Sequence, residues 1–211
     1  MRRIALYLFL LVLVALAGGG SSATAASGQT FHFRVNGSFA QAFWETQTSS
    51  SITETFVYAE SDRPGPAFLF LDEFTENYDS NGNFIGATDI FGETDSGVSF
   101  ASRGGLASAS ASASVPTTTC TYDANFNQIG CVDSGNVDVS ADWTGQGPIA
   151  RGTFNQNFHQ NGFHEVDHFN GTDRQASASA TVGGTSLGTG DLVFADLGTA
   201  KSGSLVVCHN C

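Results

Sequence analysis

The sequence predicts an all-β protein, an antiparallel β-sandwich or barrel of roughly ten strands that follows an N-terminal signal peptide. Apolar and polar residues alternate through most of the chain after residue 29, which is typical of half-buried strands. Turn-forming residues interrupt this alternation at intervals of roughly 8 to 15 residues. The composition, with 25 Gly, 18 Phe and only 13% charged residues, suits strands and turns better than helices, whose surfaces are rich in Lys and Glu.

The N-terminus has the three parts of a secretory signal peptide. Arg2 and Arg3 precede an apolar run over residues 4–17, and Ala23-Thr24-Ala25 is a small-x-small cleavage site. The run is too short to span a bilayer comfortably, so we expect no membrane span after cleavage. The sequence therefore predicts a secreted, extracellular protein that is exported by a Sec-type signal peptide (residues 1–25) and has a single all-β domain (residues 26–211).

The net charge restricts the possible partners. The chain has 20 acidic and 8 basic residues and a net charge of −12, and cleavage would remove two more positive charges. Nucleic acids and anionic membranes require basic surfaces, so neither is expected as a partner. An extracellular protein or a carbohydrate remains open as a ligand.

The strands can be followed along the chain. Residues 30–45 alternate on both sides of Asn36-Gly37, residues 51–60 alternate again, and Arg63-Pro64-Gly65-Pro66 predicts a turn. The last alternating stretch covers residues 191–207. No window of the mature chain has a helical period.

Two nine-residue segments repeat the pattern Y-D-x-N-x-N-x-I-G, at residues 78–86 and 122–130. Alternating Asp and Asn oxygens suggest a calcium loop. Phe84 and Gln128 occupy the place where an EF-hand requires glycine, however, and the closing Glu is replaced by Ile90 and Ser134. The pattern instead predicts two β-hairpin tips in which Asp and Asn adopt the turn conformations.

The four cysteines, Cys120, Cys131, Cys208 and Cys211, predict structural disulfides in an exported protein. Three connectivities are possible. The pairs with the shortest separation are Cys120–Cys131, which would clamp the second hairpin, and Cys208–Cys211, which would close a small ring at the C-terminus.

Two tracts of alternating Ala and Ser occupy residues 107–114 and 176–180. They are short and share no fixed period, which argues against a repeat architecture. We expect their small side chains to let two sheets, or a sheet and a crossing strand, approach closely.

One string resembles a catalytic motif. His164-Glu165-Val166-Asp167-His168 reads H-E-x-x-H, and with Gly171 it is similar to the zinc-binding string of metzincin proteases. On a helix, His164 and His168 could bind one zinc ion, and Glu165 would act as general base of a zinc-dependent hydrolase.

The local sequence favours a strand over that helix. Arg174 stands at the third-ligand position, and Asn161-Gly162 and Asn170-Gly171 bracket the motif as two tight hairpins would. In a strand, His164 and His168 would lie about 13 Å apart, at about 3.3 Å per residue.

The strand interpretation brings different histidines together. A two-residue turn at Asn161-Gly162 would pair His159 with His164 across two strands. This pair could bind a metal if a third ligand approached, for example His32 or an acidic group, but a solvent-facing polar pair is the simpler interpretation. No cofactor is expected on this basis, and zinc stays an alternative.

Other catalytic patterns are missing from the sequence, which has no G-x-S-x-G elbow, P-loop or dinucleotide-binding glycine motif. Trp44 and Trp143 could form a carbohydrate-binding platform if they were exposed, although buried aromatic residues are usual in a sheet core.

Three segments resemble small secreted β-rich proteins of bacteria whose function is uncharacterised. They are WTGQGP at residues 143–148, FNGTDRQASASATV at residues 169–182, and KSG at residues 201–203. The resemblance implies a β-rich exported domain and assigns no activity or site residue.

Together these patterns predict a secreted, non-enzymatic β domain with a binding or structural role at the cell surface or matrix. The alternatives are a zinc-dependent hydrolase with Glu165 as its base, and a carbohydrate-binding module.

Overall fold

The computed structural model describes residues 29–33, 37–62, 65–160 and 163–209, and it describes their side chains except at 29–33, 62, 153–160, 163–170 and 200–209. This part of the chain forms twelve strands and one short 3-10 helix. In order they are β1 (Gln29–Phe33), β2 (Gly37–Gln47), β3 (Ser51–Asp62), β4 (Ala67–Tyr78), β5 (Phe84–Thr94), β6 (Ser99–Ser102), η1 (Gly104–Leu106), β7 (Ser108–Tyr122), β8 (Gln128–Gly145), β9 (Ala150–Gln160), β10 (Phe163–Val182), β11 (Thr185–Leu187) and β12 (Leu192–His209). The prediction of an all-β antiparallel fold is confirmed.

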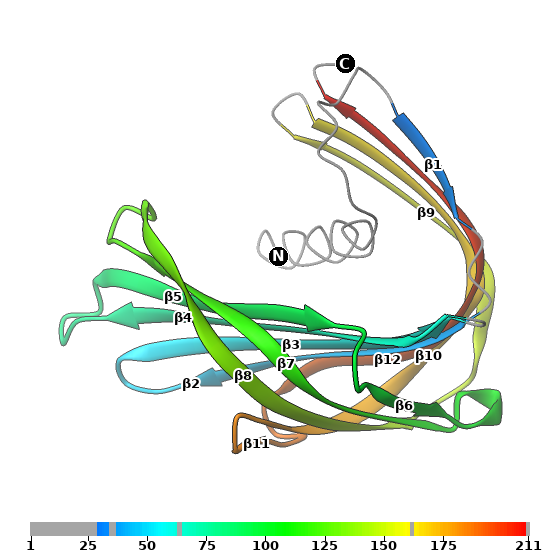
Figure 1. Ribbon diagram of the computed structural model, residues 1–211, viewed down its shortest axis with the longest axis horizontal. Helices are drawn as coiled ribbons and strands as arrows, with labels where there is room; N and C mark the ends of the chain where they lie inside the picture. Colours follow the sequence, from blue (N-terminus) through cyan, green and yellow to red (C-terminus); the bar gives the residue numbers. More distant parts are fainter. Residues whose placement is uncertain (1–28, 34–36, 63–64, 161–162, 210–211) are drawn as a thin grey trace.

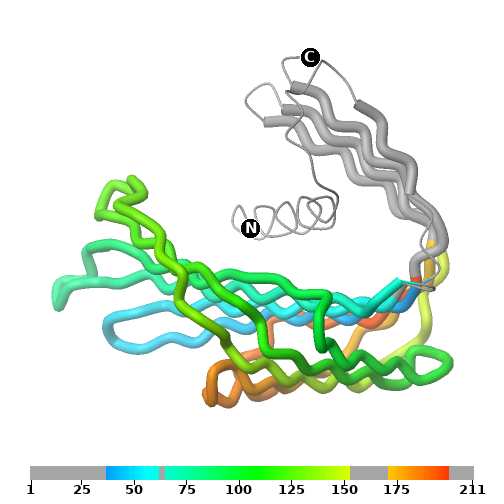
Figure 2. Tube along the Cα trace, in the orientation of Figure 1, coloured from blue at the N-terminus to red at the C-terminus, as the bar shows by residue number. Residues whose placement is uncertain are grey.

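Among the described strands, eight close into a ring in the order β12-β2-β3-β4-β5-β7-β8-β10, and β10 pairs back onto β12 (Figure 1). The 20-residue strand β10 makes this closure, because residues 176–182 pair with β8 and residues 163–175 pair with β12. Closure leaves no unpaired edge along the ring. Each remaining strand pairs with a ring strand: β1 with β12, β6 with β7, and β9 and β11 with β10. The chain trace in Figure 2 follows the same path.

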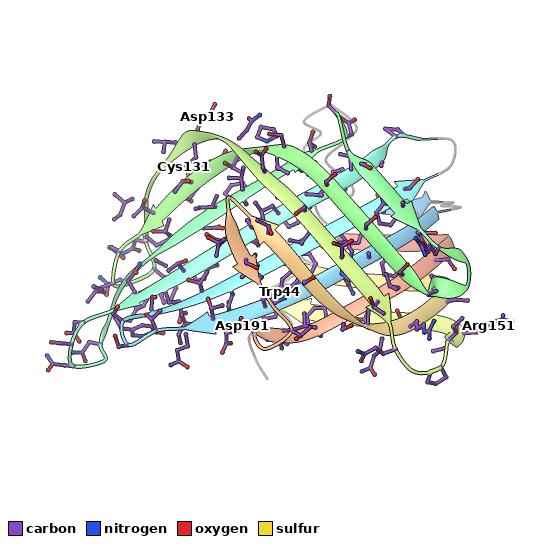
Figure 3. The ribbon with its side chains drawn as sticks, turned by 90° about the horizontal axis from the view of Figure 1, so that it is seen from below. Trp44, Cys131, Asp133, Arg151 and Asp191 are labelled. Atoms are coloured by element: carbon purple, nitrogen blue, oxygen red, sulfur yellow. A yellow bond between two sulfur atoms is a disulfide. The ribbon has the colours of Figure 1, made fainter. Side chains whose placement is uncertain are left out.

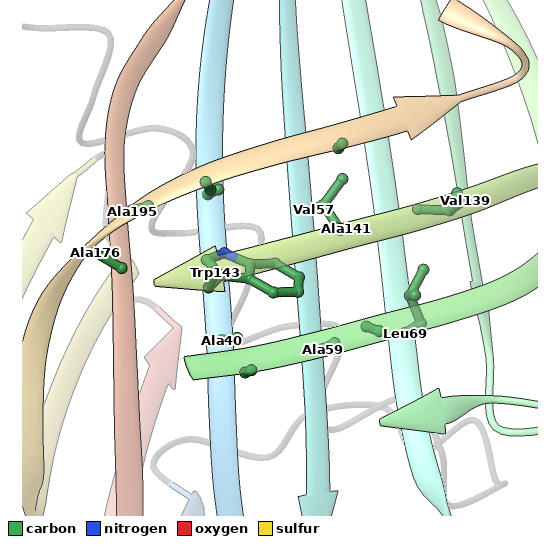
Figure 4. Close-up of a cluster of buried hydrophobic side chains, with 14 of the residues drawn as sticks. Ala40, Val57, Ala59, Leu69, Val139, Ala141, Trp143, Ala176 and Ala195 are labelled. Atoms are coloured by element: carbon green, nitrogen blue, oxygen red, sulfur yellow. The ribbon is translucent and has the colours of Figure 1, made fainter. Parts of the chain in front are cut away.

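The ring is flattened, so that two walls share one core. The first wall consists of β12, β2, β3, β4 and β5, and the strands of the second wall, β7, β8 and β10, run across it (Figure 4). The two walls contribute apolar side chains at alternate positions, as the period-2 pattern predicts. The first wall contributes Ala40, Ala42, Trp44, Val57, Ala59, Leu69, Leu71, Ala195 and Leu197, and the second Ala109, Ala111, Val115, Val139, Ala141, Trp143, Ala176, Ala178, Ala180 and Val182.

The alternating Ala and Ser tracts lie in the second wall. Ala111 and Ala178 are buried in the core, whereas Ser112 and Ser179 are exposed on the outside. In the register of the sheet, Trp143 lies between Ala109 and Ala178. The small methyl groups therefore leave room for the large indole, and the prediction that these tracts permit a close approach of two layers is confirmed.

The two tryptophans are core residues. Trp44 is 0% and Trp143 is 1% exposed, so neither can serve as a surface platform for a carbohydrate. The indole N–H of Trp143 on β8 donates to the main-chain oxygen of Gln41 on β2 at 3.0 Å. This hydrogen bond ties the two walls together across the core.

The H-E-x-x-H string lies within β10 and is a strand, as the sequence predicts. The prediction of a second tight hairpin at Asn170-Gly171 is wrong, because β10 continues through both residues. Its pairing with β12 shifts between Asn170 and Gly171. Asn170 pairs with Ser202 and Gly171 with Ala200, so the irregularity falls at Lys201 of β12, and Asn170 and Gly171 keep a continuous register with β9.

No helix in the described part of the chain has the length and apolar character needed to cross a membrane.

Candidate binding site at the twin-hairpin tip

The strand conformation separates the two histidines that a zincin site needs. His164 and His168 are four residues apart on β10, which corresponds to about 13 Å in a strand. A single zinc ion with ligand bonds of about 2 Å cannot join residues so placed. The hydrolase hypothesis built on Glu165 therefore lacks the helix on which it depends.

The predicted pairing of His159 with His164 is present in the register of β9 and β10. On its other side, His164 pairs with Cys208 of β12, and His168 and His32 both pair with Ser204. The side chains of these residues lie outside the described ones, so a metal site there stays a prediction. Among the described side chains, no group of three or more His, Cys, Asp or Glu residues is arranged to hold a metal ion.

One predicted disulfide is present. Cys120 of β7 and Cys131 of β8 are directly paired in the sheet and joined by a disulfide. The second predicted disulfide involves Cys208, whose side chain is not described, and Cys211, which lies outside the described residues. It stays a prediction.

The two repeated segments form matching hairpin loops, at residues 79–83 between β4 and β5 and at residues 123–127 between β7 and β8. In the first loop, Asp79 Oδ1 accepts from the backbone N–H groups of Asn81 and Asn83, both at 2.8 Å, and Oδ2 accepts from Asn83 Nδ2 at 3.0 Å. These bonds, above all those from Asn83, hold the pKa of the Asp79 carboxyl below its usual range. The Asp and Asn of the motif are therefore used within the loop itself.

The second loop repeats this arrangement. Asp123 accepts from the backbone of Asn125 at 2.8 Å and of Asn127 at 2.9 Å, and from Asn127 Nδ2 at 3.0 Å. The pKa of Asp123 is lowered for the same reason, with the side chain of Asn127 as the main cause. The hairpin prediction is confirmed, and the shared motif encodes a shared loop geometry.

The two hairpins lie side by side because β5 pairs with β7, with Ala87 opposite Tyr122. Gly86 makes the close approach possible, since a Cβ atom there would lie 2.6 Å from the main-chain oxygen of Tyr122. We refer to residues 78–86 and 122–132 together as the twin-hairpin tip.

Phe126 has an unusual backbone at the end of the second hairpin. Its φ of 62° lies in the left-handed region, and the equivalent residue of the first loop is Gly82, with a φ of 79°. A bulky residue in this region costs about 1–2 kcal/mol. The Phe126 ring stacks on Phe84 of the first hairpin, with centroids 4.3 Å apart and planes inclined by 8°. The loop thus retains a strained residue that places an aromatic ring at the end of the molecule.

Exposed apolar side chains gather at this tip. Ile85, Phe126, Ile129 and Val132 are 55%, 54%, 69% and 65% exposed. The disulfide between Cys120 and Cys131 joins the two strands of the second hairpin, which carries Phe126, Ile129 and Val132, and Figure 3 shows Cys131 on this hairpin. Large exposed apolar side chains that cluster on a rigid support are typical of a contact surface for a partner.

The sequence did not identify a buried carboxylate pair in the first wall. Asp72 on β4 and Asp89 on β5 are diagonal neighbours, since Asp72 pairs with Phe91 and Asp89 with Phe74. Burial, together with the charge and hydrogen bond of Asp89, raises the pKa of Asp72 to about 8. Burial also raises the pKa of Asp89, whose Oδ1 has no hydrogen-bond partner in the described part. A pKa raised to about 8 favours the protonated form of Asp72 at neutral pH. Asp72 lies seven residues before Asp79 and Asp89 six residues after Asn83, so the hairpin prediction brings the two near each other without placing them directly opposite.

No protein-family model, no curated protein and no solved structure matches this chain. The fold and the site therefore give a structural class and no family: the chain is a closed antiparallel β domain with a disulfide-supported apolar tip. The resemblance to small secreted bacterial proteins stays a prediction.

Proposed function

We propose that this chain is a secreted, non-enzymatic β domain that binds an extracellular protein at the cell surface or matrix through the twin-hairpin tip. The observation that carries the proposal is Phe126, which is held in a left-handed conformation and is 54% exposed. A strained residue that contributes little to the core is better explained by a role in binding than by stability.

The chemistry of the tip favours a protein partner. Its large exposed apolar side chains are three aliphatic groups and one phenyl ring, which suit an apolar pocket of another protein rather than the hydroxyl-rich surface of a sugar. The polar groups of Asp79 and Asp123 are already engaged within their loops. Because the two loops are fixed by these bonds and by the disulfide, little conformational entropy would be lost on binding.

The test is binding of fluorescently labelled mature protein to the cells that secrete it. Phe126→Gly and Ile129→Gln should each reduce cell-surface binding by roughly tenfold or more, as central contact residues do. Val193→Gln is the matched control, since Val193 is also an exposed apolar residue (49%) but lies on β12 outside the tip. Equal binding by the tip variants and the control would refute the proposal.

Treatment of the cells separates the two kinds of ligand. If protease treatment abolishes binding and periodate oxidation of glycans does not, the partner is a protein. The opposite result would replace the protein partner with the carbohydrate alternative.

A further inference from the structure

A second site lies at the other end of the ring from the twin-hairpin tip, close to Arg151 (Figure 3). It is a cavity of about 230 Å³ between η1, the end of β6, the starts of β2 and β9, and the middle of β10 and β12. Its lining residues are Ser38, Ser102, Arg103, Gly104, Gly105, Leu106, Ile149, Arg151, Thr172 and Thr199.

The loop that forms one side of this cavity is fixed in place. Leu106 has a left-handed φ of 51°, and its side chain is buried in the core. Arg174 of β10 fixes this loop, because its Nη1 donates to the main-chain oxygens of Gly105 at 3.3 Å and Leu106 at 3.2 Å. Gly145 permits this packing, since a Cβ atom there would lie 2.2 Å from the oxygen of Leu106. The strain at Leu106 and the bonds from Arg174 give the cavity a preformed wall.

The charge at this cavity is opposite to that of the chain. Among the residues that line it, Arg103 and Arg151 are cationic and none is acidic, although the chain has 20 acidic and only 8 basic residues. Both arginine side chains are exposed, and in the described part of the chain neither guanidinium group has a hydrogen-bond or ion-pair partner. Two exposed guanidinium groups beside a cavity that no acidic residue lines favour an anionic group in it.

The remaining lining groups supply polar and apolar contacts. The hydroxyl-bearing residues Ser38, Ser102, Thr172 and Thr199 also line the cavity, and the hydroxyl groups of Thr172 and Thr199 are hydrogen-bonded to each other at 2.6 Å. Ile149 adds an apolar surface that is 39% exposed. A site with guanidinium groups, hydroxyl groups and one apolar wall suits a ligand with an anionic head and a small apolar body.

We propose that this cavity binds a small organic oxyanion, a carboxylate, sulfate ester or phosphate ester, between Arg103 and Arg151. The planar guanidinium group matches the geometry of such oxyanions, and charge-assisted hydrogen bonds are the strongest that a side chain forms. The volume is below the roughly 300 Å³ at which pockets for drug-sized ligands begin, so the ligand is small. This site is independent of the proposed partner at the twin-hairpin tip, and either can fail without the other.

The experiment is isothermal titration of the mature protein at low ionic strength with benzoate, inorganic sulfate, inorganic phosphate and benzyl alcohol. Benzyl alcohol has the apolar body without the charge. We expect saturable binding of at least one anion and none of benzyl alcohol. Arg103→Gln and Arg151→Gln should each weaken that binding by roughly tenfold or more, which is the loss of one charge-assisted bond.

Gln128→Glu is the matched control because it shifts the net charge by the same amount at the opposite end of the ring, where Gln128 is exposed. Tighter binding of benzoate than of the inorganic ions would support an organic carboxylate. Preference for phosphate or sulfate would support the corresponding ester head. The proposal is overturned if no anion saturates the protein, if benzyl alcohol binds as well as benzoate, or if Gln128→Glu weakens binding as much as Arg151→Gln.

Discussion

Phe126 stacks on Phe84 at a centroid distance of 4.3 Å, and it does so from a left-handed backbone conformation that glycine occupies at the equivalent position of the neighbouring loop. The stack connects the two copies of one sequence motif at the end of the molecule. Since the loop geometry itself is set by Asp123 and Asn127, the phenyl ring is an addition to the loop rather than a requirement of it.

We predict that Phe126→Gly changes the free energy of unfolding by less than about 1 kcal/mol. The substitution removes a stacking contact of about 0.5–1.5 kcal/mol but also relieves a left-handed strain of about 1–2 kcal/mol. Phe84→Ala removes this stack and the edge contact of Phe84 with Tyr78 without relieving strain, so it should destabilise the protein more. Urea unfolding measures the free energy of unfolding of both variants. Equal destabilisation by the two substitutions would show that Phe126 is not strained.

The Ala and Ser tracts make a second prediction. Ala178→Leu should destabilise the protein by about 1–3 kcal/mol, because the added methylene groups enter a packed core next to Trp143. Ser179→Leu, one residue further along the same strand, places the same side chain outside and should change stability by less than about 0.5 kcal/mol. Thermal unfolding of the two variants compares them directly. Similar losses would contradict the inward orientation of the alanines.

Part of this architecture was predictable from local pattern. Period-2 alternation predicts the strands, and the two tracts of Ala and Ser predict a close approach of two layers, where Ala111 and Ala178 are buried. The closure of the ring was not predictable, because it depends on β10 changing partners from β8 to β12 along its 20 residues. Nothing in the sequence around Asn170-Gly171 distinguishes a strand that continues through both residues from a tight turn that would end it.

The two proposed binding sites also differ in how far the sequence alone could locate them. The twin-hairpin tip could be located from its repeated motif, and the disulfide at Cys120–Cys131 from its position around the second copy. The stack of Phe84 on Phe126 requires knowledge that β5 and β7 are neighbours. Arg103 and Arg151 are far apart in the sequence and share no local motif, so only the ring brings them to one cavity.

The two buried tryptophans should respond differently to the same substitution. Trp143→Phe removes a hydrogen bond to Gln41, whereas the indole N–H of Trp44 has no partner in the described part of the chain. An unsatisfied buried N–H costs about 1–3 kcal/mol, so its removal offsets part of the lost packing in Trp44→Phe. We therefore expect Trp143→Phe to be more destabilising by about 1 kcal/mol. Urea midpoints of the two variants test this, and the reverse order would contradict it.

The register of His159 and His164 leads to a prediction about metal binding. A cross-strand pair provides two imidazole groups, and Cys208, which pairs with His164 on the other side, is expected in the second predicted disulfide rather than as a zinc ligand. We expect the purified mature protein to hold less than one zinc ion per chain after zinc soaking and dialysis. Elemental analysis beside His164→Ala tests this. One tightly held zinc that the variant loses would establish a metal centre and justify peptidase assays with Glu165→Gln as a control.

The carboxylate pair of Asp72 and Asp89 predicts how stability depends on pH. Burial raises the pKa of Asp72 to about 8, so the folded protein retains a proton that the unfolded chain releases near pH 4. Between these values the folded state binds more protons than the unfolded state, and stability therefore falls as pH rises. The fall amounts to up to about 4 kcal/mol between pH 5 and pH 8, at about 1.4 kcal/mol per pH unit for one proton.

Asp72→Asn keeps a hydrogen-bonding group at this position without a titrating charge. We expect it to flatten the pH dependence and to raise the melting temperature at pH 8, by about 2–4 °C for each kcal/mol recovered. The matched control, Asp142→Asn, removes an exposed carboxylate from β8 and should leave the slope unchanged. Melting temperatures at pH 5, 6, 7 and 8 test the prediction. Other carboxyls whose pKa is raised by burial, such as Glu73 and Asp196, should leave a smaller slope in Asp72→Asn. A slope as steep in this variant as in the unaltered protein would contradict a raised pKa at Asp72.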